Sequence, residues 1–475
     1  MKLFTDVFIN GAWQSGTDRV PVHDPSDGHV IAEVATSGPN ECSAAIDSAY
    51  RAQELWGNTP PRHRAEILRT AYELMINEAD FFAELISREN GKAIADARAE
   101  VAYAAEFFRW FAEEAVRVRG DYRLAPAGDK RIIVTHEPIG VSLLITPWNF
   151  PAAMVTRKLG PALAAGCTVI VKPALETPLT ALAIADLLQR AGVPDGVLNV
   201  VLPDPVGPLV AEMLRDPRVR NLSFTGSTEV GRSLLHNTAD RVVRATMELG
   251  GNAPFLVLDD AHIEDAVAGA MLAKMRNGGC ACTAANRFYV AREVAEHFTE
   301  RFAAEMNNLT VGPGSSWETQ LGPLINGSEQ AKIAGLVARA VKEGARLVTG
   351  GVIEDGSGWF YPATVLADVN PEASILSSEI FGPVAPIVVI ESDAQATELA
   401  NATESGLVAY VYSGDVRRAM AVAANLEVGM VAINRGIVSD PAAPFGGVKQ
   451  SGLGREGGFD GIYEFLETKY IAVDL

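Results

Sequence analysis

The stretch VSLLIT at residues 141–146 decides the fold, because it opens a repeating alternation of strands and helices. Strand-like apolar runs recur at CTVIVK (167–172), VLNVV (197–201), NLSF (221–224) and TMEL (246–249), with helical patterns between them. Strand–helix–strand units of this length predict a parallel sheet that is covered by helices on both faces. The sequence therefore predicts an α/β fold of the type that binds dinucleotides, although the usual GxGxxG fingerprint is absent.

The segments on either side of this block extend the pattern. Apolar residues at helical spacing between residues 65 and 118 predict an α-rich layer, and Asn40 is the expected cap of the helix before it. Residues 252–434 again mix helices with short apolar strands, while RIIVTHEP (131–138) and the tail at 463–475 read as strands outside both blocks. A terminal strand without a partner in its own domain would be an exposed edge, so we expect it to pair with another subunit.

The composition is that of an ordinary globular protein with an acidic surface. The formal charge of −19, from 40 basic and 59 acidic residues, argues against nucleic acid or an anionic membrane as a partner, because phosphates attract clusters of Lys and Arg. The N-terminal MKLFTDVFINGAW has no apolar run long enough for a signal peptide. No run of about 20 apolar residues indicates a membrane span, so we expect no membrane partner.

The four cysteines, Cys42, Cys167, Cys280 and Cys282, have no spacing typical of a disulfide framework. This usage fits a reducing compartment, so we expect a cytoplasmic protein. The chain has no HExxH motif, CxxC pair or cluster of His and Cys, and the seven histidines are scattered. We therefore expect no metal site.

Polar or glycine-rich residues collect where the predicted strands end. They form the stretches TPWNFP (146–151), KPALETP (172–178), FTGSTEVGR (224–232), ELGGN (248–252) and NGGCACTAANR (277–287). In an open α/β sheet, ligands bind beyond the carboxyl ends of the strands, so these stretches form the candidate site. Free backbone N–H groups at the helix start after Gly226 would suit a pyrophosphate, although an ordinary capping turn has the same sequence.

Several side chains in these stretches have both a chemical and a structural interpretation. Asn149 lies between two aromatic residues and is either a donor to an oxyanion or a turn residue. Glu248 leaves an apolar strand, so burial would raise its pKa toward that of a general base unless a salt bridge holds the carboxylate. Lys172 either reaches solvent or meets an anion or hydroxyl in the crevice. Cys280 and Cys282 could be a nucleophile and its neighbour, a redox couple, half of a metal site, or packing residues.

Taken together and in this order, TPWNFP, FTGSTEVGR, MELGGN, EIFGP (379–383) and PFGGVKQSG (444–452) closely resemble the motifs of the aldehyde dehydrogenase superfamily. The similarity covers essentially the whole chain. It implies a Rossmann-type cofactor domain (residues 1–120 and 141–250), an α/β catalytic domain (251–457) and a small β oligomerisation element (121–140 and 458–475). It also implies a homodimer or a homotetramer.

The same resemblance implies NAD(P)-dependent oxidation of an aldehyde and the residues that carry it out. The family's nucleophilic cysteine lies 34 positions after the ELGG glutamate and five before an arginine, which identifies Cys282 from Glu248. Asn149 and the backbone N–H of Cys282 would hold the oxyanion, Glu248 would activate water, and Lys172 completes the expected catalytic set. Cys280 replaces the usual Gln of the family, either as a small buried thiol or as a redox partner that protects Cys282 from over-oxidation.

By the same resemblance, the cofactor is NADP or NAD and lies against residues of these motifs. They are Thr146, Trp148, Lys172, Leu175, Gly226, Ser227, Leu249, Glu379 and Phe381. Members that prefer NAD often carry Glu at the position of Leu175, where the carboxylate binds the adenosine ribose. Without that glutamate, no carboxylate repels a 2′-phosphate, and Lys172 could pair with the phosphate. NADP is therefore the expected cofactor and NAD the alternative.

The expected substrate-binding residues are Arg157, Arg276, Ser439, Phe150 and Phe445. Arg157, Arg276 and Ser439 resemble the carboxylate-binding set of succinate-semialdehyde dehydrogenases. A guanidinium offers a planar fork that fits a carboxylate, so an aldehyde with a second, carboxylated end is the expected substrate. Each arginine alone could instead form a surface ion pair. The alternative substrates are glutarate or 2-oxoglutarate semialdehyde and an aromatic or aliphatic aldehyde. A further alternative is an inactive homologue with a binding role. Arg435 is not assigned to any site.

Overall fold

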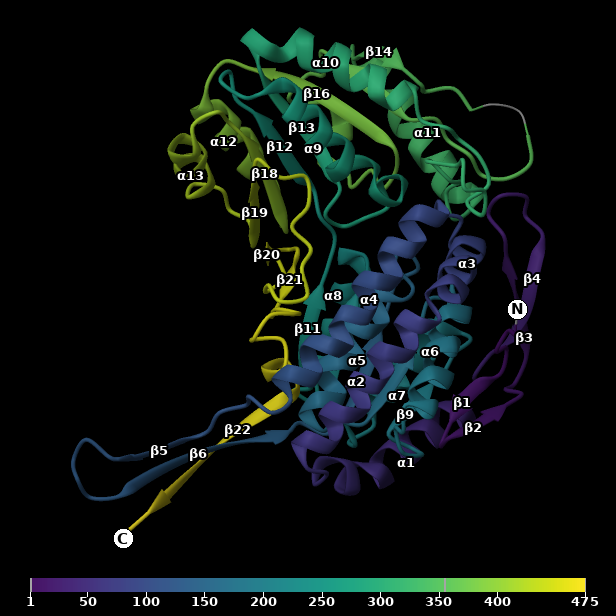
Figure 1. Cartoon of the computed structure of the whole chain (residues 1–475), viewed down its shortest axis with the longest axis vertical. Helices are drawn as coiled ribbons and strands as arrows, with labels where there is room; N and C mark the ends of the chain where they lie inside the picture. Colours follow the sequence, from purple (N-terminus) through teal and green to yellow (C-terminus); the bar gives the residue numbers. More distant parts are fainter. Residues whose placement is uncertain (1, 354–355, 475) are drawn as a thin grey trace.

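The computed structural model describes residues 2–353 and 356–474 of the 475-residue chain. Figure 1 shows two bodies, each built on one large sheet with helices packed against it, and an arm of three strands that projects away from them. Within the described residues, every helix is too short or too polar to cross a lipid bilayer. The predicted alternation of strands and helices is confirmed, and it is divided between two sheets.

The first sheet brings the carboxyl ends of its central strands to one edge. Its eight strands lie in the order β2-β1-β9-β8-β7-β10-β11-β21, and the five from β9 to β11 are parallel. The bounds are β1 (Val7–Ile9), β2 (Ala12–Gln14), β7 (Val141–Ile145), β8 (Val169–Lys172), β9 (Leu198–Val200), β10 (Val219–Thr225), β11 (Arg244–Glu248) and β21 (Gly452–Leu453). The chain runs outward from β7 to β9 on one side and from β10 to β11 on the other. The loops after β7 and β10 therefore diverge and leave a crevice between them.

Helices cover this sheet and form the predicted α-rich layer beside it. They are α1 (Pro39–Gly57), α2 (Pro61–Asn77), α3 (Ala79–Asn90), α4 (Ile94–Glu114), α5 (Ala153–Ala165), α6 (Pro178–Arg190), α7 (Val206–Arg215) and α8 (Thr228–Ala239). Every residue of α5 is buried, because α5 lies between the sheet and helices α2 and α4. The predicted cap Asn40 is wrong: α1 begins at Pro39 and its cap is Gly38, whose N–H donates to the Glu41 carboxylate at 2.9 Å. Proline suits the first helical position because no N–H is needed there.

The second sheet is built from the block after residue 252. Its strands lie in the order β14-β15-β16-β13-β12-β18-β19, and all but β14 run parallel. The bounds are β12 (Ala253–Val257), β13 (Ala285–Ala291), β14 (Arg346–Thr349), β15 (Thr364–Ala367), β16 (Val384–Ile390), β18 (Val408–Tyr412) and β19 (Met430–Ile433). The helices of this body are α9 (Ile263–Met275), α10 (Arg292–Asn307), α11 (Gly327–Lys342), α12 (Asp393–Asn401) and α13 (Val416–Ala423).

Short elements complete the chain. They are the strand pairs β3 (Arg19–His23) with β4 (Val30–Ala35) and β17 (Ser405–Gly406) with β20 (Val448–Lys449), and the 3₁₀ turns η1 (Arg276–Gly279), η2 (Ser374–Ser377) and η3 (Tyr463–Phe465). The C-terminal segment then returns to the first body, where Gly452 of β21 pairs with Glu248 of β11. The indole of Trp110 on α4 donates to the carbonyl of Gly458 at 2.9 Å. Residues 452–458 thus pack on the first body although they follow the second.

The arm consists of β5 (Asp121–Leu124), β6 (Arg131–Pro138) and β22 (Leu466–Val473). The terminal strand β22 pairs antiparallel with β6 along its whole length, so the premise that it has no partner in its own chain is wrong. Strand β6 is the antiparallel partner of both β5 and β22, so β22 finds its partner within the same chain. One edge of β22 is nevertheless free, and nearly all of its residues after Leu466 are exposed.

Candidate active site

A cavity of about 200 Å³ opens in the crevice of the first sheet and reaches across to the second body. Eight of the predicted residues line it, namely Trp148, Asn149, Gly226, Ser227, Leu249, Cys282, Glu379 and Phe381. Met154, Glu329 and Lys332 line it as well, and the sequence analysis missed them. The loops after β7, β10 and β11 therefore meet the cysteine stretch and the EIFGP loop at one place.

Three predicted cofactor residues lie at neighbouring strand ends and do not line this cavity. They are Thr146, Lys172 and Leu175, and the backbone N–H of Thr146 donates to the Lys172 carbonyl at 3.1 Å. Burial lowers the pKa of Lys172, although Glu176 acts against this shift. Because Lys172 stands at the end of β8 rather than beside Cys282, the expected catalytic role of Lys172 gains no support from this geometry.

The glycines of ELGGN allow the two bodies to approach each other. A Cβ atom on Gly251 would lie 2.1 Å from the carbonyl oxygen of Cys282, and one on Gly250 would lie 2.8 Å from the Glu379 carboxylate. The N–H of Gly251 donates to that carboxylate at 3.1 Å. Only a residue without a side chain lets the backbone pass this close to the cysteine.

The crevice has the features that a dinucleotide requires. Helix α8 begins there with Ser227, whose hydroxyl caps the helix by accepting from the Val230 N–H at 3.3 Å, and helix N-termini attract phosphates. The hydroxyls of Thr146 and Thr225 are buried, and no hydrogen-bond partner for them lies in the described part of the chain. Burial raises the pKa of Glu379 to about 7, so this carboxyl group can accept from ribose hydroxyls or donate to them. These residues fit a nicotinamide dinucleotide.

Cys282 is half-buried at the wall of the cavity. Burial raises the pKa of its thiol to about 12; Arg157 lowers this pKa, and Glu248 raises it further. Glu248 is 2% exposed, and neither of its carboxylate oxygens has a hydrogen-bond partner among the described residues. Burial holds the pKa of Glu248 well above its usual range, and the negative charge of Glu456 raises it further. A carboxyl group in this state can take a proton near neutral pH.

Asn149 is held by several hydrogen bonds. Its side-chain amide donates to the Cys280 carbonyl at 3.0 Å, which directs the amide toward the cysteine stretch. Its backbone carbonyl accepts from Lys92 Nζ and from the amide of Asn277, both at 2.7 Å. The turn that carries Asn149 is therefore fixed from two sides.

The Lys92 side chain forms a buried ion pair that the sequence analysis missed. Lys92 Nζ lies 2.5 Å from Glu100 Oε2, and both side chains are fully buried. The other oxygen of Glu100 accepts from the N–H groups of Ala152 and Ala153, at 2.8 and 3.2 Å, at the start of α5. The pair thus anchors both the Asn149 turn and the helix that follows it.

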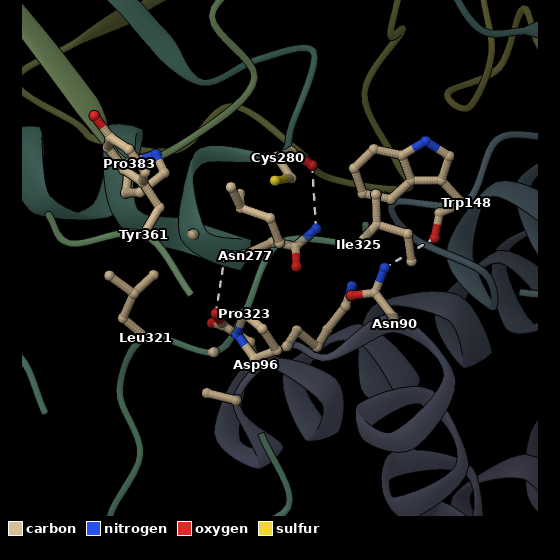
Figure 2. A pocket seen from close by; sticks show the side chains of 15 residues that line it. Asn90, Asp96, Trp148, Asn277, Cys280, Leu321, Pro323, Ile325, Tyr361 and Pro383 are labelled. Atoms are coloured by element: carbon tan, nitrogen blue, oxygen red, sulfur yellow. Dashed lines mark hydrogen bonds between the residues drawn. The ribbon is translucent and has the colours of Figure 1, made fainter. Parts of the chain in front are cut away.

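Figure 2 shows how the cysteine stretch is fixed from the opposite side, around a cavity of about 10 Å³. The N–H of Asn277 donates to the Asp96 carboxylate at 2.9 Å, and its amide donates to the Cys280 carbonyl at 3.1 Å. The amide of Asn90 donates to the Trp148 carbonyl at 3.0 Å. Helices α3 and α4 therefore supply the side chains that support both loops.

Cys280 differs from Cys282 in its surroundings. Its thiol donates to the Phe381 carbonyl at 3.3 Å, and burial raises its pKa to about 12. Both cysteines, like Cys42 and Cys167, are free thiols. The structure therefore places Cys280 as a packed thiol behind the nucleophile candidate.

The five predicted substrate residues form two contacting groups, one around Arg157 and one around Arg276. The guanidinium of Arg157 lies 4.1 Å from the centre of the Phe445 ring, and that of Arg276 lies 4.9 Å from the centre of Phe150. Arg276 also donates to the Ser439 hydroxyl at 3.3 Å. Arg157 does form an ion pair, because its Nη1 lies 3.6 Å from Glu456 Oε2, but the pair is buried and not on the surface.

The Arg157 guanidinium is buried and does not use all of its hydrogen-bond donors. It is 2% exposed, and its Nε and Nη1 atoms have no hydrogen-bond partner among the described residues. Burial alone would lower the pKa of Arg157, but Tyr103 and Glu456 raise it above its usual value, so the group stays charged. Arg435 lies apart from this cluster, exposed on the surface with its Nε directed at the Ile437 carbonyl at 3.4 Å. Arg157 therefore keeps one donor, Nε, without any partner among the described residues, while Nη1 faces Glu456 and Nη2 binds Tyr103, and a free guanidinium donor is suited to a carboxylate ligand.

A half-buried thiol, an unpaired buried carboxyl group and a directed amide stand at the edge of a dinucleotide-type crevice. This arrangement is typical of an oxidoreductase that works through a covalent cysteine adduct. Residues 13–471 match the model of the aldehyde dehydrogenase family. The chain belongs to the aldehyde dehydrogenase family.

Individual relatives are similar over nearly their whole length. The chain is 52% identical to the succinate-semialdehyde dehydrogenase of Paenarthrobacter nicotinovorans, over 94% of this chain and 99% of the relative. It is 46% identical to the NADP(+) succinate-semialdehyde dehydrogenase of Escherichia coli, over 98% of this chain and 97% of the relative. The crystal structure of succinate-semialdehyde dehydrogenase from Burkholderia pseudomallei superposes with a TM-score of 0.98 at 47% identity, over 100% of this chain and 98% of that chain. The expected fold and enzyme class, an NAD(P)-dependent aldehyde dehydrogenase, are confirmed.

Replacing Lys92 by methionine should lower the free energy of unfolding by about 3–5 kcal/mol, because Glu100 would be left as an unpaired buried charge. Urea unfolding followed by circular dichroism measures this change. Lys130→Met is the matched control, since the Lys130–Asp129 pair is exposed and its loss should cost about 1 kcal/mol or less. Equal stability of the two variants would show that the Lys92–Glu100 pair does not anchor the fold.

The thiol of Cys282 should react with iodoacetamide at a rate that rises with pH up to about pH 10, because only the thiolate reacts and burial holds the thiol pKa at about 12. Mass spectrometry of the labelled peptide measures the rate in the protein without cofactor. The Cys282→Ser variant reports any labelling of Cys280. A rate that levels off near about pH 8 would contradict the expected pKa.

Proposed function

We propose that the protein oxidises succinate semialdehyde to succinate with NADP+ as the expected cofactor and NAD+ as the alternative. The observation that carries this proposal is the buried Arg157 guanidinium, whose Nε has no partner among the described residues, in a cluster with Arg276 and Ser439 whose positive charge acts on the Cys282 thiol. An aldehyde that reaches Cys282 with one end can bring a carboxylate to these cations with the other. The similarity to succinate-semialdehyde dehydrogenases supports the same substrate.

The first step in this proposal is attack of the Cys282 thiolate on the aldehyde carbon. Arg157 favours the thiolate because its positive charge lowers the thiol pKa. The carbonyl oxygen becomes an oxyanion, which the Asn149 amide and the backbone N–H of Cys282 would stabilise; one such donor is typically worth about 3–4 kcal/mol of barrier. The Lys92 and Asn277 bonds to the Asn149 carbonyl keep this amide in place.

The thiohemiacetal then loses a hydride and becomes a thioester on Cys282. The nicotinamide cofactor, when bound, accepts this hydride. Trp148, Ser227, Leu249 and Glu379 would hold it, as residues that line the crevice. Glu248 then takes a proton from water, the hydroxide attacks the thioester, and the C–S bond breaks to release the carboxylic acid and the thiolate. One aldehyde, one water and one oxidised cofactor give one carboxylate, one reduced cofactor and two protons.

For the remaining assignments we propose the following roles. Lys172 and Leu175 contact the adenosine end of the cofactor, where the lysine would pair with a 2′-phosphate. Cys280 packs behind the active-site loop, because its thiol is buried and donates to the Phe381 carbonyl. Neither role places Lys172 or Cys280 at the reacting carbon.

Initial rates of reduced-cofactor formation test the proposal. The specificity constant kcat/KM for succinate semialdehyde should exceed that for butanal and benzaldehyde by about a hundredfold or more, because the uncharged aldehydes leave the arginine donors unpaired. Glutarate semialdehyde in the same series tests the length of the substrate, and each aldehyde is measured with NAD+ and with NADP+. Equal constants for butanal and succinate semialdehyde would overturn the substrate assignment.

We propose that the protein forms a homodimer or a homotetramer through the arm. The free edge of β22 and the exposed Tyr122, Leu124, Tyr470 and Ile471 support this assignment, since unpaired strand edges with apolar side chains are usually covered.

The change Tyr470→Asp should convert the oligomer to a smaller species in analytical ultracentrifugation, because it places a charge on that surface. Val416→Asp is the control, since Val416 is about as exposed as Tyr470 and lies on α13, which Figure 1 shows away from the arm. A monomeric wild-type protein, or an unchanged mass for Tyr470→Asp, would contradict assembly through the arm.

A further inference from the structure

One residue outside the predicted set touches both arginines of the carboxylate cluster. It is Tyr103, which α4 presents toward the start of α5 and the η1 turn. Arg157 Nη2 donates to the Tyr103 hydroxyl at 2.7 Å, and the Arg276 guanidinium lies 5.6 Å from the centre of the Tyr103 ring. Since Arg157 and Arg276 come from elements more than a hundred residues apart, Tyr103 links two groups that the chain brings together only on folding.

The hydroxyl of Tyr103 has an unused donor. A phenol both accepts and donates, and here it accepts from Arg157, so its own proton must point elsewhere. Among the described residues, no acceptor forms a hydrogen bond with that proton. The half-buried ring is fixed by edge contact with Phe107, at 5.0 Å between the ring centres. Within the described part of the chain, the cluster thus contains two unfilled donors, Arg157 Nε and the Tyr103 O–H, while Arg157 Nη1 faces Glu456 Oε2 at 3.6 Å.

We propose that Tyr103 is a further specificity-determining residue, whose O–H donates to the distal carboxylate of the substrate beside Arg157, Arg276 and Ser439. This inference rests on the proposed function. A carboxylate has about four acceptor positions, so it can receive a phenol and a serine hydroxyl as well as two guanidinium groups. An uncharged aldehyde would leave the Tyr103 O–H and Arg157 Nε without a partner, and that loss is what gives a polar site its discrimination.

The ring of Tyr103 has a second part in this arrangement. Its face holds the Arg276 guanidinium, and its hydroxyl fixes the orientation of Arg157, so the two cations point at one ligand rather than at solvent. Removal of the hydroxyl alone should therefore affect the charged substrate while the aromatic packing stays. Phenylalanine at this position makes that separation.

The test is the Tyr103→Phe variant of the full-length protein, assayed with succinate semialdehyde and with butanal. The ratio of kcat/KM for succinate semialdehyde to kcat/KM for butanal should fall about ten- to a hundredfold, mainly through KM, because a hydrogen bond to a charged group is lost. Tyr72→Phe is the matched control: Tyr72 also lies beside an arginine, Arg109 at 5.7 Å, but on α2 and outside the cluster. This control should keep the wild-type ratio.

Binding measured without turnover provides a second readout. In isothermal titration, succinate should bind Tyr103→Phe more weakly than wild type by a similar factor, and butyrate should bind both proteins equally. If Tyr103→Phe keeps both the wild-type ratio of kcat/KM values and the wild-type affinity for succinate, the inference is overturned. The proposed function still stands in that case, provided that the wild-type protein prefers succinate semialdehyde. A wild-type protein that favours butanal overturns the proposed function itself, and the role of Tyr103 with it.

Discussion

The buried ion pair of Lys92 and Glu100 is the constraint on which the geometry of the site depends. Lys92 holds the carbonyl of Asn149, and Glu100 holds the first N–H groups of α5. The Asn149 turn and the helix that carries Arg157 therefore share one anchor. Two charges without solvent persist only when each is fully satisfied, so small displacements of the turn are costly and its position is well defined.

The electrostatics of the site favour a particular order of protonation. Burial raises the pKa of both Cys282 and Glu248, and each negative charge makes the other harder to form. In the proposed mechanism, Glu248 is neutral while Cys282 is a thiolate and ionised once the sulfur is acylated, so two anions never stand together. Arg157 offsets part of the cost of each charged form, which connects the carboxylate-binding cluster with the reacting groups.

Some functional residues carried no recognisable signal in the sequence. Lys92 lies in the short connection between α3 and α4 and Glu100 lies on α4, and the contact of Lys92 with the Asn149 carbonyl appears only in the folded chain. Tyr103 reads as an apolar position of a helix, since its hydroxyl partner lies 54 residues away on α5. Lys158 could have been suspected, because it follows Arg157 in an otherwise apolar helix, and its ammonium group is buried against Glu456 at 2.5 Å.

The sequence by itself determined the two α/β blocks, the loops at the strand ends and the identity of the thiol, carboxyl and amide groups in them. Strand and helix periodicity and local turn chemistry are properties of neighbouring residues, so they can be read along the chain. Only the tertiary structure decided how these groups face each other, where β22 finds its partner, and which buried charges support the site. Most of those features depend on contacts between residues far apart in the chain, such as Lys158 with Glu456 and Lys469 with Glu137, and on the desolvation that packing creates.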